Sequence, residues 1–118
     1  MTLRDVQNQL KAKGLPWEIA KGFDTACPLS DFVPTSAVAD PHALHLKLAV
    51  NGESRQDGCS ADMINRIPQI IAHISAIFTL EPGDIILTGT PAGVGQVRSG
   101  DVMTAEIESV GCLTIPVL

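Results

Sequence analysis

The sequence lacks the motifs that mark several common classes of enzyme and metal protein. Its three cysteines, Cys27, Cys59 and Cys112, are odd in number and widely spaced, which excludes a disulfide framework and a CxxC metal or redox pair. We therefore expect buried or incidental thiols. The sequence also contains no HExxH, no GxSxG and no Walker A lysine.

Long apolar runs and an excess of basic residues are absent as well. The apolar stretch 67–78 is interrupted by His73 and Ser75 and is shorter than the roughly 18 to 20 residues that span a bilayer. Charged and polar residues near the N-terminus, such as Arg4 and Lys11, break any signal-peptide core. The net charge of -5 argues against a general nucleic-acid binder. We expect a cytoplasmic protein that binds neither membrane nor nucleic acid.

Apolar residues are abundant for so short a chain. The 118 residues suit one small domain, and 45% of them are hydrophobic. This composition indicates apolar surface that is available to another subunit or to a further part of the same domain.

The first third of the sequence predicts one helix and an irregular loop. Val6 and Leu10 lie on one helical face and Arg4, Gln7 and Lys11 share another, so we expect a helix over 4–13 that ends at Gly14. The polar face is either solvated or part of a site. Residues 17–34 are rich in Gly, Pro and Asp but carry three aromatic residues, which predicts a loop packed against the protein; these residues are Trp17, Phe23 and Phe32. A polar connector, 35–43, follows.

The remainder of the sequence predicts strands around one apolar helix. Period-two alternation over 44–50, the turn Asn51-Gly52 and polar residues 53–57 predict a β-hairpin. Ser60 and Asp62 offer N-cap chemistry ahead of a turn at 61–66 and a buried helix over 67–78, in which His73 is expected at a core or interface position. His42 and His45 are too closely spaced to share a helical face. Strands are expected over 101–108 and 113–117.

The stretch 80–95 is the most distinctive part of the chain. It reads as a turn at Pro82-Gly83, an apolar strand over 85–87 and a glycine-rich loop whose backbone can approach a ligand closely. The loop lacks a lysine after its glycines and does not follow GxGxxG, so it does not indicate a nucleotide site. The predicted fold class is mostly β with short helices (α+β), on a mixed or antiparallel sheet.

Five segments together resemble the fumarylacetoacetate hydrolase family, in the same order and spacing along the whole chain. They are Thr2–Gln7, Lys21–Asp24, Val50–Gly58, Asp62–Ile64 and Gly83–Gly95. The chain looks most like the small bacterial acylpyruvase, oxaloacetate-handling and 2-oxoacid isomerase members. The resemblance implies a β-roll or sandwich, of which this chain forms part, usually a homodimer that binds Mg²⁺ or Mn²⁺ and acts on small 2-oxo acids through a metal-bound enolate.

The resemblance also implies roles for four residues. Lys21 matches the lysine that stabilises developing enolate charge and is the expected catalytic residue. Thr90 matches the threonine that hydrogen-bonds the substrate carboxylate. Arg4 and Gln7 match substrate-binding positions near the metal. A hard cation chelated by a 2-oxo carboxylate would polarise its carbonyl, and a nearby ammonium would lower the energy of the enolate oxygen.

The expected metal ligands are missing from this sequence. The family holds its metal by a Glu-x-Glu pair and by an Asp four residues before the matched arginine, and counting back from Arg4 leads to the position before Met1. The family's His-Glu lid for proton transfer is missing too. We therefore expect residues 1–118 to be a single domain that is the C-terminal portion of a larger catalytic domain, with no metal ligand of its own.

Two functions follow from these observations. The first is a divalent-metal enzyme for acylpyruvate hydrolysis, oxaloacetate decarboxylation or keto-enol tautomerisation. The second is an inactive fragment or association module that keeps the fold without the chemistry.

Overall fold

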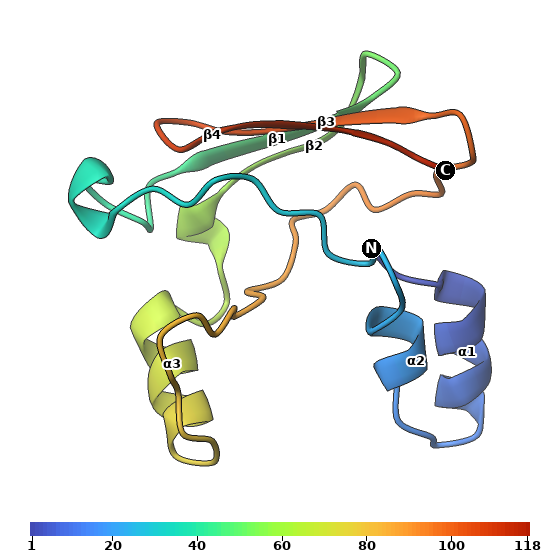
Figure 1. Ribbon diagram of the computed structural model, residues 1–118, viewed down its shortest axis with the longest axis horizontal. Helices are drawn as coiled ribbons and strands as arrows, with labels where there is room; N and C mark the ends of the chain where they lie inside the picture. The colour runs from blue at the N-terminus through green and yellow to red at the C-terminus, as the bar shows by residue number, and fades with distance from the viewer.

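The computed structural model describes all residues 1–118 and contains one four-stranded antiparallel sheet with short helices. Figure 1 shows α1 (Arg4–Ala12) and α2 (Glu18–Lys21) below one end of the sheet and α3 (Ile67–Ser75) below the other. Two single turns of 3₁₀ helix, η1 (Thr35–Ala37) and η2 (Ser60–Asp62), complete the set. The predicted fold class, mostly β with short helices, is confirmed.

The sheet is built from two hairpins that pair through their inner strands. Its strands are β1 (His45–Val50), β2 (Glu53–Cys59), β3 (Val102–Ile107) and β4 (Gly111–Pro116), in the spatial order β2-β1-β3-β4. Asn51 and Gly52 join β1 to β2 with φ angles of 52° and 82°, and a type I′ turn requires positive φ at both residues. The predicted hairpin and the two later strands are therefore confirmed.

A β-bulge interrupts the first hairpin near the middle of β2. Leu48 pairs with Gln56 while the next residue, Ala49, pairs with Ser54, so Arg55 has no partner on β1. Because β2 lies at the edge of the sheet, the bulge redirects its side chains without breaking a ladder on a second side.

The buried apolar residues form two small groups. Val50 and Met103 are opposite each other on β1 and β3 and are 4% and 5% exposed. Ala20 on α2 and the nearby Ala26 make up the second group. The N–H of Leu3 donates to Ala20 O at 3.1 Å and connects α1 to α2. α1 ends as predicted, since Gly14 follows it with a φ of 64°.

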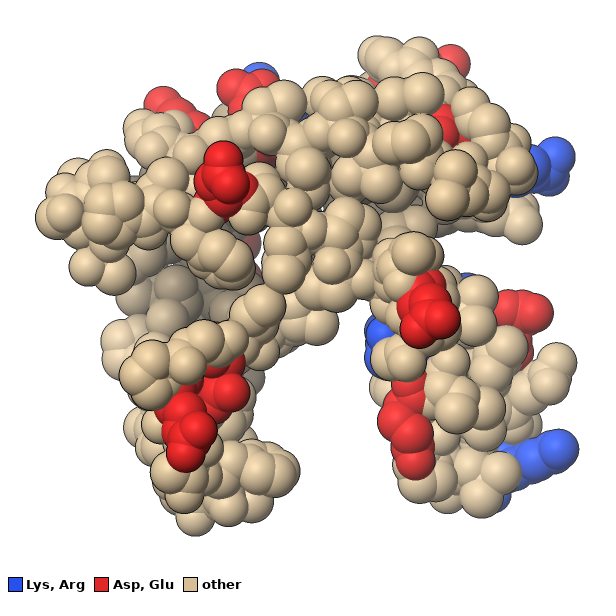
Figure 2. Space-filling view, in the orientation of Figure 1, with Lys and Arg blue, Asp and Glu red and all other residues tan.

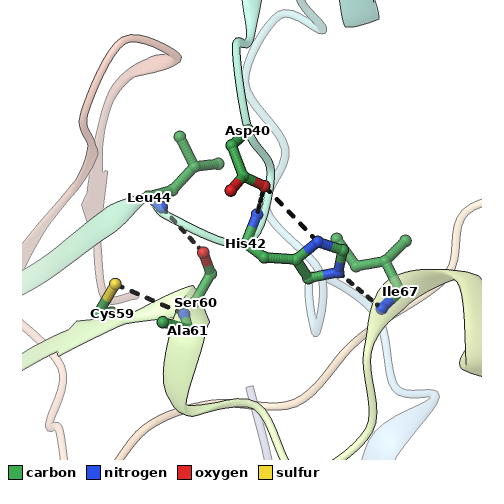
Figure 3. A network of polar contacts seen from close by, with 7 residues as sticks. All are labelled: Asp40, His42, Leu44, Cys59, Ser60, Ala61 and Ile67. Atoms are coloured by element: carbon green, nitrogen blue, oxygen red, sulfur yellow. Dashed lines mark hydrogen bonds and ion pairs between the residues drawn. The ribbon is translucent and has the colours of Figure 1, made fainter.

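Hydrogen bonds attach the segment before β1 to η2 and to α3 (Figure 3). Ser60 Oγ accepts the N–H of Leu44 at 2.9 Å, and Ser60 N–H donates to Leu44 O at 2.8 Å. The expectation that Ser60 caps a helix is therefore wrong, because its hydroxyl is engaged across the chain. The Gln69 side chain instead accepts the N–H of Arg66, the residue before α3.

Two expectations about apolar segments are also wrong. Residues 85–87 are not a strand, and Leu87 is 75% exposed, because no neighbouring strand of this chain pairs with its backbone. α3 begins at the predicted residue but has no buried side chain, so it is not the buried helix that its spacing indicates. His73 on α3 is likewise exposed.

The loop after α1 is less packed than its aromatic residues predict. Phe23 is half-buried, but Trp17 is 42% exposed and Phe32 is 75% exposed. Cys27 and Cys112 are exposed free thiols, whereas Cys59 is half-buried. None of the helices is both long and apolar enough to traverse a lipid bilayer.

Candidate active site

A cleft of about 950 Å³ lies where the N-terminal helices, the glycine-rich loop and the sheet meet. Its floor is the apolar face of β1 and β3, with Leu48, Val50 and Met103. The segment before α1 and its first turns line one side, and residues of the loop 90–97 line the other. These segments lie far apart in the sequence and meet only in the folded chain.

Three of the four predicted site residues line this cleft: Arg4, Lys21 and Thr90. Arg4 is the first residue of α1, and Lys21 is the last residue of α2. The Nζ of Lys21 donates to Thr2 Oγ1 at 2.8 Å, which fixes the direction of the side chain. An ammonium has three N–H donors, so two remain for a bound anion. The roles of these residues stay predictions.

Gln7 occupies a different position from the other three. It is 7% exposed, it does not line the cleft, and its Oε1 atom is buried without a hydrogen-bond partner. The helical face that Gln7 shares with Arg4 is therefore not uniformly exposed: Arg4 meets the cleft while Gln7 points into the protein. An unpartnered buried amide oxygen carries a cost of about 1 to 3 kcal/mol.

Thr90 is held at the edge of the cleft by the neighbouring strand. Gln56 Nε2 on β2 donates to Thr90 Oγ1 at 2.8 Å. Beyond Thr90 the loop crosses β2, where a Cβ placed on Gly93 would lie 1.9 Å from Arg55 O. Only a residue without a side chain permits this approach, as the sequence predicts for a loop of this composition.

Sequence reasoning assigned no role to Arg55 and Gln56, although both line the cleft. They are consecutive, and consecutive residues of a regular strand point to opposite faces. The bulge at Arg55 breaks this alternation, so both side chains reach the same space. Both residues lie within the segment 50–58 that resembles the family. Their shared direction could not be predicted, because a bulge depends on how two strands pair and has no signal in the local sequence.

The charges that line the cleft favour an anionic ligand. Arg4, Lys21 and Arg55 contribute cationic side chains, against one carboxylate, Asp5. Such an excess of positive charge around a hollow raises the local concentration of anionic ligands such as carboxylates.

The side chains present do not form a metal site. No group of three or more His, Cys, Asp or Glu residues is arranged to hold a metal ion. Mg²⁺ and Mn²⁺ are bound mainly by carboxylate and other oxygen ligands, and Asp5 is the one carboxylate that lines the cleft. Residues 1–118 by themselves therefore do not fit the divalent cation that the resemblance implies.

The chain belongs to the fumarylacetoacetate hydrolase family. The family described as "Fumarylacetoacetate (FAA) hydrolase C-terminal" matches residues 1–118. The chain is 52% identical over 109 residues to oxaloacetate tautomerase YcgM of Escherichia coli (strain K12). The matched region covers 92% of this chain and 50% of that protein. It is 54% identical over 117 residues to the human mitochondrial oxaloacetate tautomerase FAHD1, covering 99% of this chain and 53% of that protein.

A solved structure of similar fold is fumarylpyruvate hydrolase from Pseudomonas aeruginosa in complex with Mn²⁺ and pyruvate. It matches with a TM-score of 0.96 and 38% identity, over 100% of this chain and 51% of that chain. The chain thus spans about half the length of the relatives that it matches.

Proposed function

We propose that residues 1–118 form part of an enzyme that acts on small 2-oxo acids, with keto-enol tautomerisation of oxaloacetate as the first reaction to test. The observation that carries the proposal is the convergence of Arg4, Lys21 and Thr90 on one cationic cleft. The names of the relatives at 52% and 54% identity support oxaloacetate as a substrate. Acylpyruvate hydrolysis and oxaloacetate decarboxylation are the other reactions of this class.

The side chains of this chain account for binding and for part of the chemistry. Arg4 pairs with a substrate carboxylate, and Thr90 donates a hydrogen bond to one. In tautomerisation a proton leaves C3 and another is added to the C2 oxygen, so negative charge develops on that oxygen. The two free N–H donors of Lys21 stabilise this charge.

Mg²⁺ or Mn²⁺ is the proposed cofactor of the whole enzyme. Because the side chains described here do not fit that ion, its ligands have to come from outside residues 1–118. We propose accordingly that these residues are the C-terminal portion of a larger catalytic domain. A homodimer and a cytoplasmic location stay predictions for the whole enzyme.

The test is an activity assay of two proteins. One is the 118-residue chain alone. The other, the joined protein, is the same chain fused to the part of Escherichia coli oxaloacetate tautomerase YcgM that it does not match. Each protein is given oxaloacetate and acetylpyruvate with Mg²⁺. Enol-keto conversion, decarboxylation and C–C cleavage are followed separately. Activity in the joined protein that is lost on Lys21→Met supports the proposal. A folded joined protein that converts neither compound contradicts it.

A second candidate is an association module without activity, favoured by the lack of a metal-ligand group in the chain. Calorimetric titration of the joined protein with Mn²⁺ and oxalate, with and without Lys21→Met, separates the two. Tight, metal-dependent oxalate binding that Lys21→Met weakens contradicts the association module.

A further inference from the structure

The amide of Gln56 makes three contacts with the glycine-rich loop. Its Nε2 lies 2.8 Å from Thr90 Oγ1, 2.8 Å from Pro91 O and 3.3 Å from Ala92 O. An amide nitrogen carries two protons, so the two short contacts use both, and the longer contact shares one of them.

These contacts determine the orientation of the amide. Two of the three neighbours of Nε2 are backbone carbonyls, which only accept hydrogen bonds. A flipped amide would place its own oxygen against both carbonyls and lose the bonds to Pro91 and Ala92. The nitrogen must therefore face the loop, and the hydroxyl oxygen of Thr90 must act as the acceptor.

The direction of this hydrogen bond leaves Thr90 with one proton to donate. An amide nitrogen accepts no hydrogen bond, so the hydroxyl proton of Thr90 cannot be directed at Gln56. Thr90 lines the cleft, where an acceptor such as a carboxylate can receive that proton.

Backbone packing holds the loop at neighbouring points on β2. Gly93 lies against Arg55 O so closely that a Cβ there would be 1.9 Å away, and a Cβ on Gly58 would be 3.0 Å from Pro91 Cβ. The bulge at Arg55 presents Gln56 to the cleft between these two points. The loop is therefore restrained over the residues that follow Thr90.

We propose that Gln56 is a positioning residue that makes Thr90 a hydrogen-bond donor to the substrate carboxylate. This inference rests on the proposed function for its ligand, a small 2-oxo acid. Gln56 restrains the loop through Pro91 and Ala92 and determines the hydroxyl direction through Thr90. It acts through Thr90 and needs no contact with the reacting atoms.

The first measurement concerns the loop alone. Gln56→Met keeps the length of the side chain and removes its donors. Backbone order parameters of Thr90, Ala92 and Gly93, measured by NMR on the 118-residue chain, should fall from about 0.85 to below about 0.6. The matched control is Gln9→Met, an exposed position on α1 outside the cleft, where the loop values should not change. Unchanged order in Gln56→Met overturns the proposal.

The second measurement is a double-mutant cycle on 2-oxo acid binding and turnover, with oxaloacetate as substrate and pyruvate as the bound probe. It uses the 118-residue chain and the joined protein. Gln56→Met should weaken binding or kcat/KM by about tenfold in the wild-type background. In a Thr90→Val background the same change should cost less than about twofold, because the hydroxyl that it directs is already gone. Additive effects overturn the proposal.

Failure of the proposed function can be distinguished from failure of the role proposed for Gln56. A wild-type protein that neither binds nor converts a 2-oxo acid contradicts the proposed function, while the order parameters still decide whether Gln56 restrains the loop. A wild-type protein that is active, with a rigid loop in Gln56→Met or with additive mutations, contradicts only the role of Gln56.

Discussion

Gly93 is the residue at which the glycine-rich loop and β2 come closest together. It has a φ of 97°, and the carbonyl oxygen of Arg55 occupies the space that a side chain would need. Two separate constraints, one on the backbone and one on space, thus require glycine at this position.

Replacing Gly93 by Ala should be costly for both reasons. We expect Gly93→Ala to lower the free energy of unfolding by about 2 to 4 kcal/mol and to displace the loop from β2. Gly89→Ala is the matched control, because Gly89 has a φ of 100° but no atom within 4 Å of a Cβ. It should cost about 1 kcal/mol. Urea unfolding compares the two, and equal losses would contradict the steric constraint.

Asp101 is the one carboxylate whose pKa departs clearly from its ordinary value. The hydrogen bond from the backbone N–H of Arg98, followed by that from the side-chain amide of Asn51, holds the pKa of Asp101 below its usual range. The same Asn51 side chain accepts the N–H of Val102, so the carboxylate is part of the connection between the hairpin turn and β3.

The lowered pKa of Asp101 predicts a loss of stability in acid. Its contribution is fully present above the pKa of the unfolded carboxylate and is lost as the pH falls through the lower folded value. Asp101→Asn should therefore lower the melting temperature at pH 7. Below about pH 4, the melting temperature of this variant should fall less than that of the wild type. Asp31→Asn, at an exposed carboxylate without hydrogen bonds, is the control. Parallel melting curves for Asp101→Asn and wild type in acid would contradict this assignment.

At the scale of elements, α3 depends on a side chain of the connector before β1. His42 is 16% exposed, and its Nε2 accepts the N–H of Ile67, the first residue of α3, at 3.1 Å (Figure 3). Since α3 has no buried side chain, this hydrogen bond carries more of its attachment than it would in a packed helix. The imidazole must be unprotonated at Nε2 to accept it.

Removing this acceptor should loosen α3. We expect His42→Leu to speed amide exchange throughout α3 and to reduce stability by about 1 to 2 kcal/mol, because the Ile67 N–H loses its partner. His73→Leu makes the same chemical change at an exposed position on α3 and should leave exchange nearly unchanged. Exchange in α3 that is equal in the two variants would exclude the proposed attachment.

At the scale of the molecule, the chain is unusually open. Its accessible surface is 8841 Å², whereas a folded chain of 12.4 kDa typically exposes about 6,100 Å². Its radius of gyration is 15.6 Å, against about 13.5 Å for a compact domain of this length. Figure 2 shows a hollow between the part that contains α3 and the part that contains α1 and α2. Uncharged side chains cover most of the face in view.

Apolar residues account for much of this excess surface. Only four apolar residues are buried, while large apolar side chains on and after α3 are exposed, including Ile77 at 65%, Phe78 at 64% and Leu87 at 75%. Exposed apolar area of this kind is usual at surfaces that other protein covers. The high hydrophobic content therefore stays on the surface of this chain instead of filling its core.

The isolated chain should consequently bind an apolar fluorescent dye or self-associate. We expect the double variant Phe78→Ser and Leu87→Ser to reduce dye fluorescence and association without changing the circular dichroism of the sheet. Leu118→Ser is the control, because Leu118 is 96% exposed but lies beyond β4, far from α3 in Figure 1. Sedimentation velocity measures the association. A monomeric wild-type chain that binds no dye would contradict this expectation.

The sequence by itself determined the features that depend on neighbouring residues. The positive φ angles of Asn51 and Gly52 define the hairpin, Gly14 ends α1, and alternation marks β1 and β3. These structures depend on local backbone preferences and on a repeat of two or about 3.6 residues, so they can be read from a short window. The family was also recognisable, because five ordered segments match it along the chain.

Only the tertiary structure decided which of these residues meet. The contact of Gly93 with β2 and the amide of Gln56 on Thr90 join segments more than thirty residues apart, as the 34-residue separation of Gln56 and Thr90 illustrates. The bulge at Arg55 lies within a local hairpin, but it too depends on how two strands pair. Burial was decided in the same way, since Gln7 is enclosed while α3 and Leu87 are not. Apolar periodicity states which face of an element can be buried, but whether it is buried depends on the protein atoms that lie opposite it.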